Sequence, residues 1–585
     1  MAFSNLTSQI GTNYIPSEEE LDHIKNSILP EPTAKLADLE IEINRVQEIY
    51  SSLTEQRHVL LAEIEGYHNL ISPARRLPID ILQEIFLHTL PSTHNAVMDP
   101  YECPLLLTQI CNGWRRIALT TPQLWSSIHI PVPPIARGHP HHWGPIHFGD
   151  LPEEFRISTL SCLKSYATSI TNWLGRSGVT PLSISLYDPR DSFVPKEHYD
   201  IIIDSFLPFA CRWKNLALDT YSPFLTRIAA LTESDVPFLE SLTLHDIMNS
   251  ANNPSNPLPV WKSSGIVKSH RLTKIDYTQL EDNIANFSFK WAQLTDIKLS
   301  QSSYDWGAPN ANITLTDIVT VLSLAPRLIN FHSEIKLTNT DLASRSSMSP
   351  LPLLNLQKMV FHDGSADCRP LFDFLNVPSL LHLEFFPINL SSITVLSTFL
   401  PQVSETILSL TTSYSFFVRP NHRPALSQCQ KLTSIIIKSA PSLGPTPWSP
   451  TPVDFIDDIF LNDLTHPTGH PDRIAPALEV FECQTGGNFS DAAVLKFIKA
   501  KQSRPDIAKL KRISIRFTRP KELDFSSDEE VLQYVADGLG VDVRYPVGLN
   551  PKAPFAFTPD AGVPLADNPY GWSTSSSNWG TWPMQ

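Results

Sequence analysis

One spacing of apolar residues recurs along most of the chain and limits what it can fold into. An apolar residue is followed three positions later by a second, and two positions after that by a third. The last two flank a single residue, as they do on a short strand that buries one face. Nine copies have this spacing: Val179-Leu182-Ile184, Trp213-Leu216-Leu218, Leu239-Leu242-Leu244, Leu272-Ile275-Tyr277, Leu294-Ile297-Leu299, Leu356-Met359-Phe361, Leu380-Leu383-Phe385, Leu432-Ile435-Ile437 and Leu510-Ile513-Ile515.

Stretches with helical patterns lie between these triplets, at residues 161–174, 199–209, 314–324, 455–464 and 491–500. The triplets that start at 213, 239, 272, 294 and 356 are 26, 33, 22 and 62 residues apart, so we expect a degenerate copy in the last gap, near Leu328 and Phe331. A strand plus a helix at this spacing predicts an irregular leucine-rich-repeat-like solenoid over residues 159–544, with a parallel sheet on its inner face. A non-repetitive α/β domain would show similar triplets, and this alternative stays open.

Residues 32–72 carry the pattern of one long helix that ends before Pro73. In a heptad, position a holds Leu36, Ile43, Tyr50, Arg57, Ile64 and Ile71, and position d holds Leu39, Val46, Leu53, Leu60 and Tyr67. Apolar residues outside these positions, at Ile41, Ile49, Leu61 and Leu70, widen the seam and favour packing on more than one neighbour. Self-association remains the alternative: across a parallel dimer Lys35 and Glu40 would attract, whereas Glu42 would face Gln47 and Gln56 would face Leu61.

Two short amphipathic helices are expected between residues 73 and 130. Pro78 suits a first helical turn, where the missing N–H would be unpaired in any case. The apolar face of the first helix consists of Ile81, Leu82, Ile85 and Phe86, and that of the second consists of Leu105, Leu106, Ile110, Trp114, Ile117 and Ala118. A unit of about 55 residues cannot bury both faces by itself, so a partner or the flanking helix must cover the remainder.

The same segment contains four motifs in a fixed order: Leu77-Pro78, Ile110-Cys111, Trp114-Arg115 and Leu124-Trp125. Their order resembles that of an F-box, and an insertion at residues 92–104 departs from the family pattern. Together with the heptad helix and the leucine-patterned remainder, essentially the whole chain resembles the large F-box-like family of mushroom-forming fungi. The alternative is a helical subdomain of the core without that role.

The resemblance implies a substrate-recognition adaptor of a cullin-type (SCF) ubiquitin ligase. In that function a Skp-type adaptor, which holds a cullin and a RING subunit, would bind Leu77, Pro78, Ile81, Leu82, Ile85 and Phe86. The solenoid would bind a target protein whose identity the resemblance does not give. The alternative function is an F-box-like protein-binding scaffold outside any ligase.

Strand alternation predicts which residues of the sheet face a target. If Leu242 and Leu244 point into the core, then the intervening residues point outward. The outward set comprises Ser241, Thr243, His245, Lys274, Asp276, Asp296, Lys298, His382, Glu384, Arg512, Ser514 and Arg516. Such a mixed-sign column suits specific protein capture, and we expect Asp276, Lys298 and Glu384 to bind the target. A solvated sheet face would carry similar residues, which is the competing interpretation.

Composition narrows the classes of partner. The chain has 45 Lys and Arg against 60 Asp and Glu, a net charge of −15 with no basic stripe, so nucleic acid and anionic membrane are not expected partners. The seven cysteines are dispersed without a CxxC pair and read as reduced thiols. The first residues lack the features of a secretory signal, so we expect a cytoplasmic or nuclear protein.

No catalytic motif was found among GxGxxG, the P-loop, GxSxG and HExxH, so we expect no enzymatic activity and no cofactor. A hydrolase hidden in an α/β domain is a distant alternative.

Four histidines, His139, His141, His142 and His147, are close enough to suggest zinc or nickel, yet the intervening prolines and glycine indicate an irregular loop within a linker at residues 131–158. Disorder is expected at residues 1–31 and 545–585, where Trp572, Trp579 and Trp582 could form a peptide ligand.

Overall fold

The computed structural model falls into two units, Met1–Ile85 and Phe86–Gln585. It describes residue 6 and residues 10–71, 73–133, 153–188, 196–220, 225–246, 261–279, 284–301, 315–335, 350–363, 368–386, 390–418, 422–438, 456–467, 469–470, 473–484, 487–517, 519–523 and 528–545. Apart from Tyr545, the predicted tail at 545–585 lies outside these residues, and so do the histidines at 139, 141, 142 and 147.

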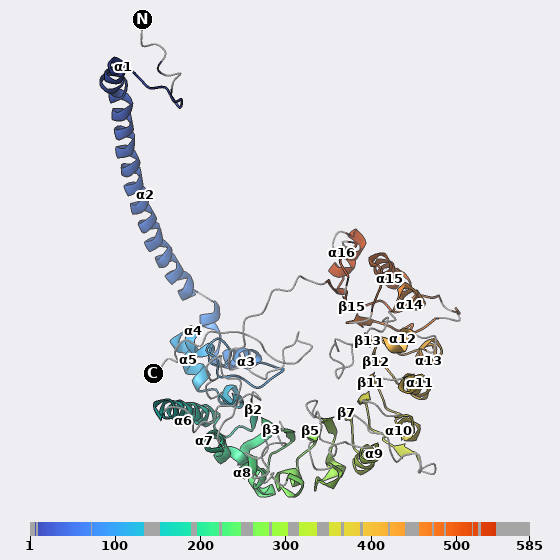
Figure 1. The fold of residues 1–585 in the computed structure, drawn as a ribbon. Coiled ribbons are helices and arrows are strands. Elements are labelled where there is room, and N and C mark those ends of the chain that lie inside the picture. The colour runs from blue at the N-terminus through green and yellow to red at the C-terminus, as the bar shows by residue number, and fades with distance from the viewer. Residues whose placement is uncertain are drawn as a thin grey trace. The chain divides into compact units, whose positions relative to one another are not determined.

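The first unit consists mainly of helix (Figure 1). Its elements are α1 (Glu18–His23), η2 (Ile24–Ile28), α2 (Pro30–Ile71), η3 (Pro73–Arg76) and the beginning of α3 (Ile79–His88). The long helix predicted from the heptads is present as α2. Regular structure starts earlier than expected, because Ser17 and Glu20 form a capping box in which Glu20 Oε2 accepts the Ser17 backbone N–H at 2.9 Å. Pro30 and Pro32 do not interrupt α2, since both lie in its first turn.

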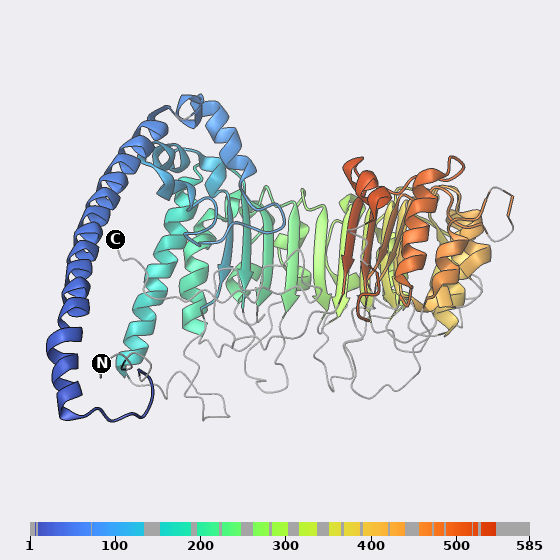
Figure 2. The same ribbon diagram turned by 90° about the horizontal axis from the view of Figure 1, so that it is seen from above.

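The second unit is built on a sheet of fourteen parallel strands in strict sequence order (Figure 2). They are β1 (Ser127–Pro131), β2 (Leu182–Tyr187), β3 (Trp213–Thr220), β4 (Ser241–Asp246), β5 (Lys274–Gln279), β6 (Asp296–Gln301), β7 (Asn330–Ile335), β9 (Lys358–Asp363), β11 (His382–Phe386), β12 (Ser409–Thr412), β13 (Ser434–Ile437), β14 (Val480–Cys483), β15 (Arg512–Arg516) and β16 (Gly540–Arg544). A separate pair joins β8 (Leu351–Pro352) to β10 (Leu375–Asn376). The predicted α/β class with a parallel sheet is confirmed, and the unbroken strand order agrees with a solenoid rather than with a doubly wound sheet, in which the order reverses.

Each of the nine triplets lies at a strand of this sheet, and the degenerate copy near Phe331 forms β7. Strand β14 has the same spacing in Leu478, Phe481 and Cys483, all fully buried, but its third position is a cysteine that the apolar pattern did not count. In β12 the third position is Thr412. The first residue of one triplet was assigned wrongly, because Val179 is 92% exposed and β2 begins only at Leu182.

Helices line the outer side of the sheet in this unit (Figure 1). They are α6 (Glu153–Arg176), α7 (Lys196–Phe206), α8 (Thr226–Ala229), α9 (Leu315–Leu324), α10 (Arg369–Phe374), α11 (Leu390–Phe399), α12 (Ser415–Val418), α13 (His422–Gln428), α14 (Asp458–Asp463), α15 (Asp491–Ser503) and α16 (Glu529–Ala536). Short 3-10 turns complete the repeats: η6 (Leu207–Arg212), η8 (Glu233–Asp235), η10 (Trp261–Ser263), η11 (Ile266–Lys268), η12 (Ile284–Asn286), η13 (Trp291–Gln293) and η15 (Leu400–Val403). All five predicted helical stretches overlap a helix. Helix α16 is capped by Asp528, whose side chain accepts the backbone N–H groups of Glu530 and Val531.

The core lies between the sheet and these outer elements. Leu242 and Leu244 are buried in β4, whereas the alternating Ser241 and Thr243 are only partly covered. In the middle of the sheet a cluster of phenylalanine rings fills this space, with Phe372 at 5.1 Å from Phe385 and 4.9 Å from Phe399 between ring centroids. The triplets therefore supply the inner layer of the core, as the alternation predicted.

The last residues of the segment 73–130 are not helical: they form the first strand of the sheet. The segment's helices α4 (Leu107–Ile110) and α5 (Asn112–Leu119) and the turn η4 (Pro122–Trp125) lead directly into β1. Trp125, Ile128 and Ile130 have the triplet spacing and are fully buried, so the last motif of this segment is also the first repeat of the sheet. In the described part of the chain, no helix combines the length and the apolar composition needed to cross a membrane.

Candidate functional site

An apolar row runs from the two residues before α3 along the exposed side of the helix. Leu77, Ile81 and Ile85 are 36%, 45% and 41% exposed, and Pro78 begins the helical turn beside them without a backbone N–H. Leu82 and Phe86 lie on the other side of α3 and are buried, with 6% and 0% exposure. Four of the six residues predicted to contact an adaptor are thus accessible, and for Leu82 and Phe86 burial in the chain's own fold corrects the expectation.

The motif residues around Trp114 make contacts within this segment. The Trp114 ring packs on Phe86 with centroids 4.9 Å apart. Cys111 caps α5, since its Sγ accepts the backbone N–H of Trp114 at 3.4 Å, and Arg115 Nε donates to the carbonyl oxygen of Thr108 at 2.6 Å. These motif residues join α3, α4 and α5 to one another.

Trp125 attaches the segment to the sheet. Its indole N–H donates to the carbonyl oxygen of Ala118 at 2.8 Å, and its ring meets Trp173 of α6 edge-on at 4.9 Å. Trp173 in turn donates to the carbonyl oxygen of Ser127 in β1 at 3.1 Å, while the Arg176 guanidinium lies 4.7 Å above the Trp125 ring. Helix α5, strand β1 and helix α6 are therefore held by one buried tryptophan pair.

The insertion at residues 92–104, which departs from the family pattern, packs against the first strand. The carbonyl oxygen of Ala96 accepts the backbone N–H of His129 at 2.8 Å, and Asn95 bridges Ser127 and Ser185 with two hydrogen bonds of 3.0 Å. Ala96, Val97 and Met98 in the insertion are buried. Because β1 is the terminal strand of the sheet, the insertion covers an edge that would otherwise offer unpaired backbone groups to other chains.

The register of the parallel strands places one residue of each strand in a continuous row on the face away from the core, which we call the central row. It consists of His129, Ser185, Ala217, Thr243, Asp276, Lys298, His332, Val360, Glu384, Thr411, Ile436, Glu482, Ser514 and Asp542. Asp276, Lys298 and Glu384, the residues predicted to bind a target, all belong to it. Asp276 and Lys298 are direct neighbours, but Glu384 lies three strands further along, so the structure brings together only two of the three.

Asp276 and Lys298 are part of a charged cluster with His245 and Asp219. Lys298 Nζ lies 3.1 Å from one carboxylate oxygen of Asp276, and His245 Nε2 lies 2.9 Å from the other. Asp219 Oδ2 is 3.8 Å from His245 Nδ1. Sequence alternation indicated His245, which follows the last apolar residue of its triplet. Asp219 holds the same position after Leu218, so the same alternation could have indicated it, but it was not among the predicted residues.

In this charged cluster, burial and the neighbouring charges shift the pKa values in opposite directions. Burial by itself would lower the pKa of His245, but its contacts with Asp219 and Asp276 outweigh burial and raise that pKa to about 9. Burial would likewise raise the pKa of Asp276, yet the neighbouring His245 and Lys298 hold it below its ordinary value. At neutral pH His245 is therefore a cation held between the carboxylates of Asp219 and Asp276.

Glu384 lies in a different environment on the same face. Its carboxylate is 3.6 Å from Nε2 of His362, whose ring packs on Phe386 at 4.7 Å and near His332 at 5.4 Å. Burial acts to raise the pKa of Glu384, but the hydrogen bond with His362 and the nearby Lys438 keep it lowered. The histidines and the aromatic ring were not among the residues predicted from the sequence.

The raised pKa of His245 predicts a pH-dependent contribution to stability. A group whose pKa rises from 6.5 to about 9 on folding stabilises the fold fully below pH 6.5 and loses that effect as the pH rises through 9. Replacing His245 by Gln should therefore cost at most about 3 kcal/mol of unfolding free energy at pH 6 and much less at pH 9.5. Urea unfolding at both pH values measures the difference, with His270→Gln as an exposed control. An equal cost at both pH values would contradict the charged state.

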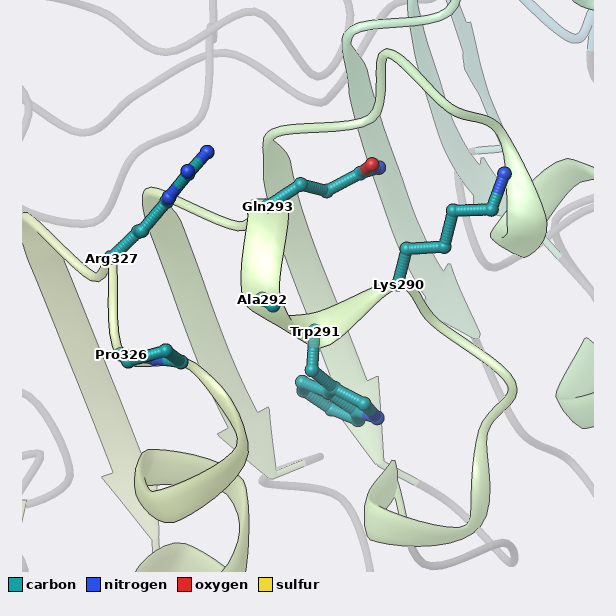
Figure 3. A pocket seen from close by; sticks show the side chains of 6 residues that line it. All are labelled: Lys290, Trp291, Ala292, Gln293, Pro326 and Arg327. Atoms are coloured by element: carbon teal, nitrogen blue, oxygen red, sulfur yellow. The ribbon is translucent and has the colours of Figure 1, made fainter.

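A shallow depression of about 400 Å³ lies beside η13 (Figure 3). Lys290, Trp291, Ala292, Gln293, Pro326 and Arg327 line it. Figure 3 shows the Trp291 ring pointing away from the side on which the Lys290 and Arg327 side chains extend. Lys290 pairs with Glu233 at 2.5 Å, and the Gln293 amide donates to two backbone carbonyl oxygens, so these polar groups serve the loop itself.

Among the residues that the structure describes, no group of three His, Cys, Asp or Glu side chains is arranged to hold a metal ion. Comparison with models of known protein families gave no match, and comparison with curated proteins gave none. The resemblance to an F-box therefore rests on the four motifs and on the residues that carry them.

Proposed function

We propose that the chain is a substrate receptor of a cullin-type ubiquitin ligase, in which α3 binds a Skp-type adaptor and the central row of the sheet binds a target protein. The observation that carries the proposal is the exposed apolar row of Leu77, Pro78, Ile81 and Ile85. Apolar residues gathered on one exposed helix side mark an interaction surface. They belong to a segment whose other motif residues are used internally.

Helix α3 has two apolar sides with different uses in this proposal. Leu82 and Phe86 stabilise the chain itself, whereas Leu77, Ile81 and Ile85 remain open to a partner. An adaptor that covers the open side would remove it from water, and this burial would drive binding. The ubiquitin transfer would take place on partner subunits in the cytosol or nucleus, so the chain itself needs no catalytic residue and contributes proximity.

The attachment of this segment to the sheet supports the same function. The Trp125–Trp173 contact and the bonds between the insertion and β1 tie α5 to the first strands. These contacts lie within the second unit and hold α5 at the first strand of the sheet that carries the central row. The mixed charges of the central row favour a partner with complementary charges and exclude others.

The direct test of the ligase proposal is reconstitution with the full chain. Co-expression with a Skp-type adaptor and a cullin–RING pair should yield one stable complex by gel filtration, and addition of the ubiquitin-activating and ubiquitin-conjugating enzymes should modify a protein captured by the chain. If neither adaptor nor cullin co-purifies, the scaffold alternative without ligase assembly would replace this proposal.

Target binding predicts a selective loss when the charges of the central row are reversed. The combined variant Asp276→Lys, Lys298→Glu and Glu384→Lys should abolish association with the target, because complementary charges set the register of the two surfaces. Adaptor binding should persist. The melting temperature should fall by a few degrees, since Asp276→Lys places a cation beside His245.

A matched control carries the same change in net charge away from this face: Glu405→Lys, Lys431→Glu and Glu529→Lys. Glu405 and Lys431 form an exposed pair 3.9 Å apart, and Glu529 is exposed on α16. Quantitative mass spectrometry of co-purified proteins compares the two variants with the original chain. If the central-row variant keeps every partner that the control keeps, the target site lies elsewhere.

A further inference from the structure

Helix α2 is uncovered along its whole length. None of its described side chains is buried, and residues at both heptad positions remain open: Leu36 and Ile43 at position a are 57% and 55% exposed, and Leu39 at position d is 61% exposed. Ten of the eleven residues at positions a and d between Leu36 and Ile71 are apolar. A helix of 42 residues is about 60 Å long, and an apolar seam of this length calls for a partner of similar length.

The period of the seam indicates the kind of partner. An α-helix has 3.6 residues per turn, so a seam that repeats every 3.5 residues drifts around a straight helix by about 20° per heptad. Contact along such a seam is maintained only if two helices wind around each other with a left-handed supercoil. The strict repeat from Leu36 to Ile71 therefore fits another long helix with the same period.

We propose that a second copy of this chain covers α2, forming a parallel two-stranded coiled coil. Three of the six residues at position a are isoleucine, Ile43, Ile64 and Ile71, and three of the five at position d are leucine, Leu39, Leu53 and Leu60. Branched residues at a combined with Leu at d favour two parallel strands. Arg57 is the one charged residue in the seam, and a single polar residue at position a restricts the oligomeric state and the register.

The charges beside the seam favour the parallel orientation. In a parallel pair Lys35 faces Glu40 of the second copy and Glu63 faces His68 of the second copy, and no like charges meet between positions g and e. In the antiparallel register that sets Leu36 opposite Tyr67, Glu42 faces Glu63 of the second copy at two symmetric places. Like charges in facing positions repel, so the antiparallel dimer is disfavoured.

Dimerisation would double each binding surface. Two copies of α3 and two sheets on one rod would hold a target with repeated features more tightly than either copy alone, because the second contact becomes intramolecular. The dimer itself does not depend on the proposed ligase function, since its argument uses only the residues of α2.

The mass of the full chain in solution tests the proposal. The original chain, at 65.6 kDa per copy, should sediment as a dimer of about 131 kDa, twice that mass. The variant Val46→Glu with Leu53→Glu, in the seam, should sediment at the mass of one copy. The matched control, Ile41→Glu with Val59→Glu, changes two apolar residues that are also exposed on α2 but outside positions a and d, and should remain dimeric.

Thermal unfolding of each variant shows whether the sheet unit is intact, so a misfolded variant is not mistaken for a dissociated one. A monomeric original chain, a mass of three copies, or equal dissociation of the seam and control variants would each overturn the proposal.

Orientation is tested at Gln47, which faces Glu42 of the second copy in the parallel dimer and Thr54 in the antiparallel one. Gln47→Lys adds two attractive pairs to the parallel dimer, and Gln47→Glu adds two repulsive ones. At low salt the dimer dissociation constants of these variants should differ by about tenfold, with Gln47→Lys the tighter. Equal dissociation constants would overturn the parallel orientation.

Discussion

Replacing Leu77, Pro78 and Ile81 together by alanine is expected to weaken binding of the Skp-type adaptor by at least about a hundredfold. These exposed residues would be covered by the adaptor, and the loss of apolar area at three positions amounts to about 3 kcal/mol. Titration calorimetry with the purified adaptor and the full chain measures the change. The fold should persist, because Leu82 and Phe86, which stabilise α3 from its buried side, are unchanged.

A control with three exposed apolar residues elsewhere separates this effect from a general loss of apolar surface. Tyr101, Val179 and Leu354 are 82%, 92% and 58% exposed, and their replacement by alanine should leave adaptor affinity within about twofold. Unchanged adaptor binding by the Leu77, Pro78 and Ile81 variant would remove α3 from the proposed interface.

Replacing Trp125 by alanine is expected to lower the unfolding free energy of the second unit by about 3–5 kcal/mol. The indole is fully buried, donates to the carbonyl oxygen of Ala118 and packs on Trp173, so its removal leaves a cavity and breaks a buried hydrogen bond. Denaturant unfolding followed by circular dichroism measures the loss.

The conservative variant Trp125→Phe retains much of the packing but not the donated hydrogen bond, so it should cost less, about 1–2 kcal/mol. If alanine at this position costs less than about 1 kcal/mol, the tryptophan pair does not hold the segment to the sheet.

The sequence predicted which face of the sheet the candidate site residues lie on, but not their contacts. Alternation correctly placed Asp276 and Lys298 on the face away from the core, because the side-chain period of a strand is a local property. It could not show that Lys298 and His245 contact Asp276 or that Asp219 contacts His245, since those contacts depend on how four neighbouring repeats stack. For α3, helical spacing grouped Leu82 and Phe86 with Ile81 and Ile85, and only packing separated the buried pair from the exposed one.

The sequence by itself determined the elements whose signal is carried within one repeat: the long heptad helix, nine strands marked by apolar triplets, and their parallel arrangement in order. Each follows from a period of 3.5 or 2 residues and from the need to bury one face. The tertiary structure decided where the segment at residues 73–130 ends, because Ile128 and Ile130 become strand only when β2 pairs with them. It also decided the role of the insertion, in which the carbonyl oxygen of Ala96 accepts the backbone N–H of His129. No local pattern predicts this hydrogen bond, because the backbone groups at a sheet edge bond to whichever segment the packing places beside them.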